Sequence, residues 1–383
     1  MLHPIFSTRG LPELLVLLLT CLVQGGCASL FIKRGQPRQR IVRIVSGSIG
    51  FLLGTHLLLY LSLRGTLATL ATWVRGVALV WAVLSLIWLA GYGITAFLPA
   101  PGHSRSRRGF LRTARAALFG IPTVAAGYGI FVERFKMNLR EQKIELPGLP
   151  PALDGLRLVQ LTDVHLSAFV SERELQRAID MANETKAHIA LITGDLITDM
   201  GDPLDLCIDR LATLRADLGI YGCLGNHERY AEAEDYTTQR AGRRGLQFLR
   251  SQNLKLTWNG ASINLAGVDY QRTNRPYLTG AEALVDPVAF NVLLSHNPDV
   301  FPVAREKGFP LTLSGHTHGG QVRAEILQQE LNFARFFTPY VDGLYRQGNS
   351  AIFVSRGIGT IGLPARFGAP PEVALITLCR TSS

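Results

Sequence analysis

Nearly all the long apolar runs of the chain lie in its first third. Four stretches contain no Lys, Arg, Asp or Glu, and they cover residues 14–32, 44–63, 77–98 and 116–132. A hydrocarbon core about 30 Å thick needs roughly 20 helical residues, so the first three have the length of a transmembrane helix and the fourth is short. The pattern predicts a membrane anchor over residues 1–132 that consists of about four transmembrane helices.

The rest of the chain alternates short apolar runs with amphipathic stretches. We expect strands at 157–161, 189–192, 220–224, 262–267, 291–294, 311–313, 351–355 and 373–378, and helices at 172–184 and 203–216. Strands that alternate with helices form βαβ units, so residues 154–383 are predicted to be an α/β domain with a largely parallel sheet. Pro147, Pro150 and Pro151 mark residues 133–153 as a linker.

The formal net charge of +10 is distributed unevenly. Residues 1–132 contain 13 Lys and Arg against one acid, Glu13, whereas the remainder is slightly acidic. A basic chain raises the possibility of nucleic-acid binding. Here the basic residues lie between apolar segments, where membrane topology explains them, and we expect no nucleic-acid partner.

Basic residues also predict the orientation in the membrane. Residues 33–43 and 105–115 each contain five Lys or Arg, and such loops remain on the cytoplasmic side. Four crossings then place the N-terminus and residues 133–383 outside the cytoplasm, which predicts a multi-pass protein of a bacterial inner membrane with a periplasmic domain. Basic residues between 134 and 143 favour the opposite orientation.

Arg107 and Arg108 precede Gly109, Phe110 and Leu111, and the sequence resembles a twin-arginine export signal. Such a signal would make the twin-arginine (Tat) export machinery a partner. The alternative is an ordinary cytoplasmic cluster of basic residues. Both interpretations send residues 133–383 across the membrane.

Polar motifs follow five of the predicted strands. In chain order they are Thr162-Asp163-Val164-His165, Gly194-Asp195, Gly225-Asn226-His227-Glu228, Ser295-His296-Asn297-Pro298 and Gly315-His316-Thr317-His318. Ligands of α/β folds gather beyond the carboxyl ends of strands, where each motif falls. Carboxylates and imidazoles suit Mn, Fe or Zn, and one carboxylate such as Asp195 can bridge two cations. The glycines of these motifs allow tight turns.

The order of these motifs resembles that of the calcineurin-like metallophosphoesterase family. The resemblance covers roughly residues 155–380 and implies a four-layer αββα sandwich with two divalent metal ions, Mn, Zn or Fe. It implies that one ion is held by Asp163, His165 and His318. It implies that the other is held by Asn226, His296 and His316, with Asp195 bridging the two.

The resemblance also implies roles for residues that bind no metal. His227 would face the substrate, stabilise charge on the phosphoryl oxygens and help to protonate the leaving group. Glu228 would orient His227 by a hydrogen bond. Purple acid phosphatases have a Tyr at the position of Thr198, so no tyrosinate colour is expected here.

Motifs near the C-terminus resemble those of a bacterial membrane-associated or Tat-exported branch of the family. They include Ser355-Arg356-Gly357-Ile358-Gly359 and Arg366-Phe367-Gly368-Ala369-Pro370-Pro371-Glu372. A guanidinium matches phosphate oxygens, so Arg356 could clamp a substrate phosphate. The alternative is a structural ion pair between Arg356 and a residue such as Glu372.

Together these features predict an enzyme that hydrolyses phosphodiester or pyrophosphate bonds with a metal-bound hydroxide. Because the anchor confines the domain to a layer near the bilayer, we expect a lipid-linked or cell-envelope substrate. Two alternatives remain. Reversed topology favours a UDP-2,3-diacylglucosamine pyrophosphatase of lipid A synthesis. A sensor or scaffold could retain the metals without catalysis, although every expected ligand is present.

Overall fold

A computed structural model describes residues 10–33, 37–60, 65–97, 105–271, 276–326 and 329–381. The chain divides into two compact units. One contains residues 1–130 and 362–364, and the other contains residues 131–361 and 365–383.

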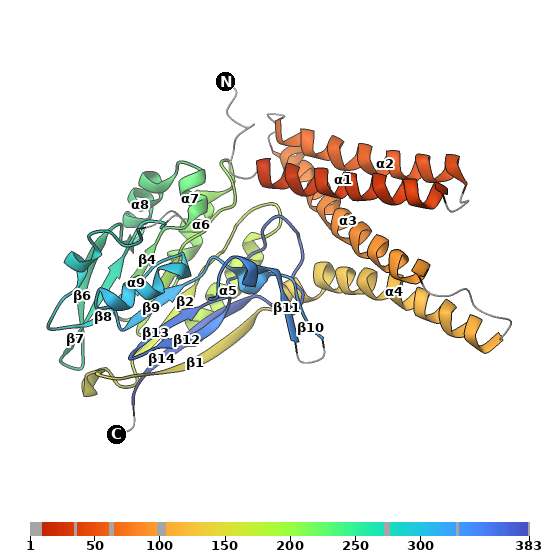
Figure 1. Ribbon diagram of the computed structural model, residues 1–383. Helices are drawn as coiled ribbons and strands as arrows, with labels where there is room; N and C mark the ends of the chain where they lie inside the picture. Colours follow the sequence, from red (N-terminus) through yellow and green to blue (C-terminus); the bar gives the residue numbers. More distant parts are fainter. Residues whose placement is uncertain are drawn as a thin grey trace. The chain divides into compact units, whose positions relative to one another are not determined.

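The first unit is helical (Figure 1). Its elements are α1 (Gly10–Lys33), α2 (Arg38–His56), the 3-10 helix η1 (Leu57–Tyr60), α3 (Thr66–Phe97) and α4 (Arg105–Phe131). Hydrogen bonds of polar side chains join three pairs of these helices. Gln24 of α1 donates to Ser85 of α3 at 2.9 Å, and Trp81 of α3 donates to Ser48 of α2 at 2.7 Å. Trp88 of α3 donates to the carbonyl of Phe119 in α4 at 3.1 Å.

The apolar helices agree only in part with the predicted anchor. Within the described residues, two helices are long and apolar enough to cross a membrane, over residues 66–91 and 112–135, and a shorter apolar stretch covers residues 14–29. The predicted segment 44–63 is divided, because α2 ends at His56 and residues 61–64 lie outside the described part. The predicted basic loop 105–115 forms the first turns of α4, where the side chains of Arg107 and Arg108 are not described.

The second unit contains two six-stranded mixed sheets (Figure 1). The first sheet has the order β1 (Asn138–Leu146), β14 (Glu372–Arg380), β2 (Arg157–Leu161), β3 (Ile189–Thr193), β4 (Ile220–Cys223) and β5 (Leu246–Phe248). The second has the order β12 (Gly343–Gln347), β13 (Ser350–Val354), β9 (Leu311–Ser314), β8 (Phe290–Leu294), β7 (Ala261–Gly267) and β6 (Gln252–Trp258). A separate hairpin pairs β10 (Arg323–Ile326) with β11 (Gln329–Asn332).

The prediction of parallel pairing is right for the central strands of both sheets. Strands β2 to β5 are parallel neighbours, and so are β13, β9, β8 and β7. The pairs β14 with β2, β12 with β13 and β6 with β7 are antiparallel. Helix α5 (Glu172–Glu184) has the predicted bounds, whereas α6 (Leu204–Leu211) is shorter than predicted.

The predicted linker over residues 133–153 is wrong in part. Residues 138–146 form β1, which pairs in parallel with β14 at the edge of the first sheet. Ile144 and Leu146 are buried, while charged residues alternate with them on the exposed side. Charged side chains are typical of edge strands because they discourage pairing with other chains. Because β1 contains so many charged residues, the sequence predicted a linker here instead of a strand.

An apolar core lies between the two sheets. It combines Leu158 of β2 and Leu191 of β3 with Leu265 of β7, Leu313 of β9 and Phe353 of β13. Strand residues that alternate between two faces place one set of apolar side chains in this layer.

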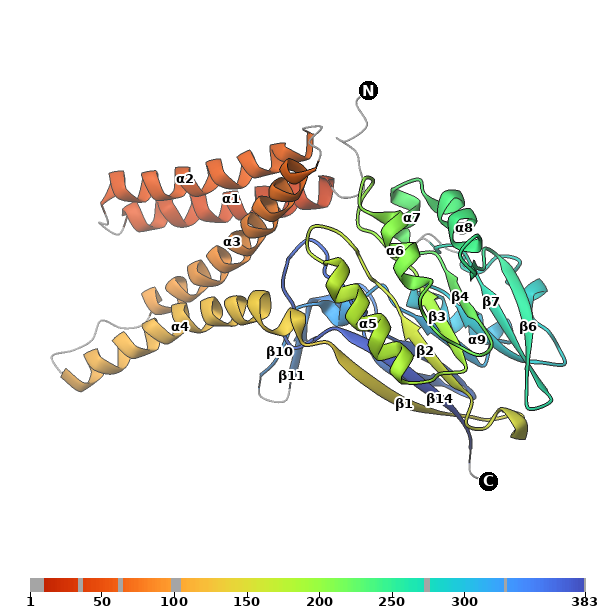
Figure 2. The ribbon, with the colours of Figure 1, turned by 180° about the vertical axis from the view of Figure 1, so that it is seen from behind.

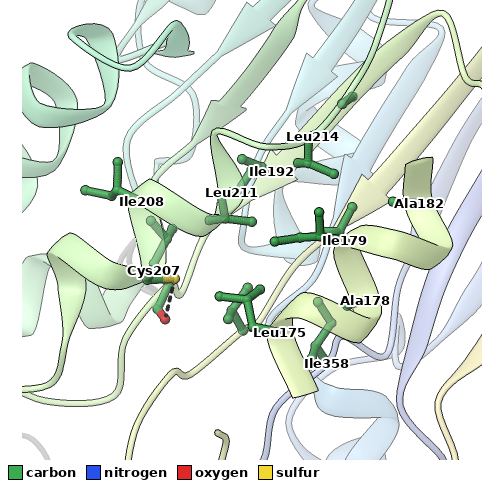
Figure 3. Close-up of a cluster of buried hydrophobic side chains, with 14 of the residues drawn as sticks. Leu175, Ala178, Ile179, Ala182, Ile192, Cys207, Ile208, Leu211, Leu214 and Ile358 are labelled. Carbon is green, nitrogen blue, oxygen red and sulfur yellow. Dashed lines mark hydrogen bonds between the residues drawn. The ribbon is translucent and has the colours of Figure 1, made fainter. Parts of the chain in front are cut away.

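Helices cover the outer faces of both sheets. Helices α5 and α6 lie on the outer face of the first sheet (Figure 2). Leu175 and Ile179 of α5 pack with Leu211 of α6 and Ile192 of β3 (Figure 3). On the second sheet, Ala304 of α9 (Phe301–Glu306) belongs to a cluster with β7 and β8. The layers therefore follow the order helix, sheet, sheet, helix.

Replacing Ile179 by Ala tests this packing. We expect Ile179→Ala to lower the free energy of unfolding by about 2–5 kcal/mol, because the side chain is fully buried and its removal leaves a cavity. Unfolding of the full chain in detergent can be followed by circular dichroism. Arg173→Ala, on the exposed face of the same helix, should change the free energy by less than about 0.5 kcal/mol. Equal effects of the two variants would contradict the assignment of the buried face.

Candidate metal centre

The predicted metal ligands lie just beyond the carboxyl ends of five strands. They are Asp163 and His165 after β2, Asp195 after β3, Asn226 after β4, His296 after β8, and His316 and His318 after β9. Since β2, β3 and β4 are parallel neighbours, as are β8 and β9, their ends lie at corresponding edges of the two packed sheets. Residues far apart in the sequence thereby reach one place.

The backbone at five of these ligands is left-handed. The φ angle is 50° at Asp163, 48° at His165, 56° at Asp195, 78° at His316 and 52° at His318. A positive φ costs a non-glycine residue on the order of 1–3 kcal/mol, and such strain concentrates at functional sites. The fold therefore holds these side chains in place at the expense of backbone energy.

The donor atoms form three overlapping groups. Within each group the ligand atoms lie within 4.8 Å of one another, and the groups are Asp163 with His165 and His318, Asp195 with His296 and His316, and Asp195 with His165 and His227. The first group has the same residues as one ligand set that the sequence resemblance implies. The second contains His296 and His316 of the other implied set, together with Asp195. Asp195 and His165 each occur in two groups.

Asp195 is the centre of the arrangement. Its Oδ2 atom lies 3.0 Å from Nε2 of His296, 3.5 Å from Nε2 of His165 and 3.9 Å from Nε2 of His227. Its Oδ1 atom accepts the backbone N–H of His227 at 2.9 Å. One oxygen is therefore fixed by the backbone while the other faces three imidazoles. On the opposite side, Oδ1 of Asp163 lies 3.4 Å from Nε2 of His318.

Hydrogen bonds from Nδ1 fix which ring nitrogen of His296 and of His227 faces the centre. Nδ1 of His296 lies 2.7 Å from the carbonyl of Thr193, and Nδ1 of His227 lies 2.7 Å from the carbonyl of Thr198. A carbonyl only accepts, so Nδ1 carries a proton in both rings, and in the neutral imidazole the Nε2 lone pair faces the centre. Thr198 also contacts Nδ1 of His165 through Oγ1 at 3.1 Å.

Thr198 therefore orients two of the histidines, a role that the sequence did not reveal. The sequence identified Thr198 only as the position of a missing tyrosine. Its position three residues after Asp195 was the available signal, because the turn that carries Asp195 must bring Thr198 beside the same histidines.

Asn226 provides a test of whether these residues fit a cation. Its Oδ1 atom is buried and, within the described part of the chain, has no hydrogen-bond partner. A buried carbonyl oxygen without a partner costs about 1–3 kcal/mol, which coordination to a cation would remove. The preceding Gly225 lies against Asp195, since a Cβ there would be 2.1 Å from its Oδ1 atom. The cluster of histidines, aspartates and Asn226 fits a metal site.

The charges in the cluster are strongly coupled. Burial raises the pKa of Asp163 to about 6, while His296 and His227 hold the pKa of Asp195 well below its usual range against the effect of burial. Burial acts to lower the pKa of His296, but the carboxylates of Asp195 and Asp163 raise it to about 10. Burial lowers the pKa of His316 to about 3. His316 is therefore a neutral imidazole at pH 7, the form that binds metals.

The predicted contact between Glu228 and the His227 ring is wrong. The carboxylate of Glu228 accepts the backbone N–H groups of Asp195 at 3.0 Å, Leu196 at 2.7 Å and Gly225 at 2.8 Å. The ring of His227 is instead oriented by Thr198. Glu228 is fully buried, which raises its pKa to about 7. It holds together the two turns that carry Asp195 and Asn226.

Of the two alternatives for Arg356, the contacts in the structure are those of the structural ion pair. The Arg356 Nε atom lies 2.7 Å from Oδ2 of Asp342 and 3.7 Å from Oε2 of Glu372. The alternative of an ion pair with Glu372 is therefore closer to the observed contacts, and Asp342 is the nearer partner. Arg140 contacts both of these acids and Arg323 contacts Asp342, so the guanidinium of Arg356 belongs to a network.

Arg366 is a second residue whose importance the sequence did not show. Its side chain is fully buried and donates to the carbonyls of Gly359 at 2.9 Å, Ala369 at 3.0 Å and Arg356 at 2.9 Å. It also approaches the carbonyl of His318 at 3.4 Å. Arg366 thus joins the C-terminal loops to the turn that carries His318. An arginine in a segment rich in Gly and Pro was the available signal.

Comparison with known proteins agrees with this geometry. Residues 156–320 match the family described as Calcineurin-like phosphoesterase. A Bacillus subtilis (strain 168) protein named uncharacterized metallophosphoesterase YkuE is 32% identical, over 72% of this chain and 99% of its own. A Bos taurus protein named transmembrane protein with metallophosphoesterase domain is 28% identical, over 76% of this chain and 67% of its own.

Among solved structures, a dimetal phosphatase from Danio rerio is 11% identical and covers 58% of this chain and 99% of its own, with a TM-score of 0.35. That likeness is too weak to carry an argument.

The chain belongs to the calcineurin-like metallophosphoesterase family. Membership makes it a phosphoesterase that depends on metal, in a family that binds dimetal centres, and its histidine and aspartate clusters fit such a site. The apolar helices, together with relatives named as transmembrane proteins, indicate association with a membrane.

Replacing Glu228 by Gln tests its role between the two turns. A glutamine amide keeps one accepting oxygen but presents an NH₂ group to backbone donors. We expect a loss of about 1–3 kcal/mol in stability and roughly 10- to 100-fold weaker metal binding, measured by thermal unfolding and by metal titration. Glu232→Gln, an exposed isosteric change, should alter neither quantity. Unchanged metal affinity in Glu228→Gln would show that the Glu228 carboxylate does not hold the metal ligands in place.

Proposed function

We propose that this chain is a membrane-anchored enzyme that hydrolyses phosphodiester or pyrophosphate bonds in a lipid-linked or cell-envelope substrate. The observation that carries the proposal is the convergence of imidazoles from separate strands on Asp195, with one carboxylate oxygen facing His165, His227 and His296. Such a donor set suits a pair of Mn, Zn or Fe ions.

Each proposed ligand has a place in that set. Asp163, His165 and His318 would hold one ion. Asn226, His296 and His316 would hold the other, and Asp195 would bridge the two. When bound, the ions would supply positive charge to the phosphoryl group and lower the pKa of a water molecule.

The residues of the chain would carry out the remaining steps. His227 has its Nδ1 proton directed to the carbonyl of Thr198, so its Nε2 atom, 3.9 Å from Oδ2 of Asp195, is the ring nitrogen that can exchange a proton on the side of the centre. We propose that Nε2 donates a proton to the leaving oxygen. No Ser or Cys nucleophile is needed, because the attacking group would be water.

The position of the domain follows from the sequence arguments. We propose four membrane crossings with residues 133–383 outside the cytoplasm, in a bacterial inner membrane. The lipid bilayer would be a partner, and Arg107 and Arg108 would engage the twin-arginine export machinery. We propose no nucleic-acid partner, since the basic surplus lies among the apolar segments. In the reversed topology, the substrate would be a cytoplasmic nucleotide-linked lipid such as UDP-2,3-diacylglucosamine.

Two substitutions separate metal binding from turnover. Asp195→Asn removes the charge at the centre, and we expect the purified chain to lose its metal by elemental analysis. His227→Ala should keep two ions per chain yet hydrolyse an aryl phosphodiester about 10²- to 10⁴-fold more slowly. By distance alone His227 could serve as a ligand, so loss of an ion in His227→Ala would reverse its assignment. If the parent chain binds two ions but hydrolyses no phosphodiester, the result would favour the alternative that the protein is a sensor or scaffold.

Reporter fusions at the C-terminal Ser383 test the topology. A phosphatase reporter that works only in the periplasm should be active when it is fused at Ser383. A fluorescent reporter that matures only in the cytoplasm should stay dark at the same position. The opposite pattern would overturn the outward orientation and favour the cytoplasmic nucleotide-lipid substrate.

A further inference from the structure

Three phenylalanines form an exposed cluster in the turn after β11. The turn contains the 3-10 helix η7 (Phe333–Phe336) and the following Phe337. The side chains of Phe333, Phe336 and Phe337 are 69%, 83% and 74% exposed. The ring of Phe333 lies 5.7 Å from that of Phe336 and 5.4 Å from that of Phe337. The three rings therefore gather into one apolar surface, which we call the phenylalanine turn.

Both ends of the phenylalanine turn are attached to the loops of the metal centre. At one end, the buried Asn332 donates to the carbonyl of Gly319 at 3.1 Å, one residue after His318. The same side chain accepts the backbone N–H of Ala334, the second residue of the turn. Gly320 lies so close that a Cβ there would be 2.0 Å from Oδ1 of Asn332. The start of the turn is thus fixed to the loop that carries His318.

At the other end, the hydroxyl of Thr338 donates to the carboxylate of Asp299. Asp299 lies three residues after His296, directly after the Ser295-His296-Asn297-Pro298 motif. The turn is therefore held between two loops that carry proposed metal ligands. Its rings are presented outward by a fixed backbone.

An exposed apolar patch of this kind marks a surface that meets another apolar phase. Three occupants could cover it: a lipid bilayer, a protein partner, or the apolar helices of this chain. Within the described residues, the chain contains two helices that are long and apolar enough to cross a membrane, and such an anchor would keep the catalytic unit near lipid. Aromatic and basic side chains are typical of segments that lie in the interface, and Arg335 stands among the three phenylalanines. These features favour lipid.

We propose that the phenylalanine turn inserts Phe333, Phe336 and Phe337 into the surface of a lipid bilayer, bringing the metal centre to phosphate groups in the headgroup layer. This inference names the lipid surface itself as a ligand, and it rests on the proposed function only for the identity of the substrate. Binding of the turn to lipid can be tested without any turnover.

The first test measures contact with lipid directly. The full chain, with Phe336→Trp or Val288→Trp, is reconstituted in nanodiscs of anionic and zwitterionic phospholipids, with or without bromine on the acyl chains. The fluorescence of the parent chain, which comes from its own tryptophans, is subtracted from that of each variant. Val288 is 80% exposed but precedes β8, at the opposite end of that strand from His296. We expect brominated lipid to quench the added emission of Phe336→Trp at least about threefold more than that of Val288→Trp.

Equal quenching at the two positions would overturn the proposal. That outcome would leave a protein partner, or the chain's own helices, as the cover of the turn. The test does not depend on hydrolysis, so its failure is distinct from failure of the proposed function.

The second test compares substrates. In the double variant Phe336→Ser and Phe337→Ser, we expect hydrolysis of a phosphodiester lipid in vesicles to fall about fivefold or more, while hydrolysis of a soluble aryl phosphodiester stays within about twofold of the parent. Val288→Ser should retain both activities. Equal loss on both substrates, or no loss on the lipid, would contradict docking by the turn. Inactivity of the parent on both substrates would count against the proposed function and leave the quenching result standing.

Discussion

The structure depends on the burial of two carboxylates among imidazoles at the joined edges of two sheets. Asp163 and Asp195 are almost fully buried, and burial of an ionised group is costly unless opposite charge compensates it. Nε2 of His296 lies 3.0 Å from Asp195, close enough to supply that charge by protonation, and bound cations would supply it more effectively. The left-handed backbone at five of the proposed ligands is the conformational cost of keeping these groups together. A metal centre accounts for both costs at once.

Residues that surround the proposed ligands hold the ligands in position. Glu228 ties the turns of Asp195 and Asn226, and Arg366 ties the C-terminal loops to the turn of His318. Thr198 holds the rings of His165 and His227. These contacts are structural, and each restricts where a donor atom can lie. Attachment of the phenylalanine turn to the same loops would link the position of the centre to the surface of a bilayer.

The sequence predicted the central strands and the donor motifs because both have local signals. A buried parallel strand is a short apolar run, and the residues that follow it must lie at the carboxyl edge. The sequence did not predict the contacts of Glu228, and for Arg356 it offered Glu372 but not the nearer partner Asp342. A carboxylate or a guanidinium can pair with many groups, and residues distant in the chain decide which of them it meets. Strand β1 was missed because its charged outer face resembles a solvated linker. The phenylalanine turn required the structure, which alone shows that its rings are exposed.

Crystals of the full chain grown with Mn²⁺ would test the central claim most directly, by anomalous scattering at the manganese edge. We predict two peaks about 3.5–4 Å apart, one beside Asp163, His165 and His318 and the other beside Asn226, His296 and His316, with Asp195 between them. A single peak, or manganese bound away from Asp195, would contradict the account.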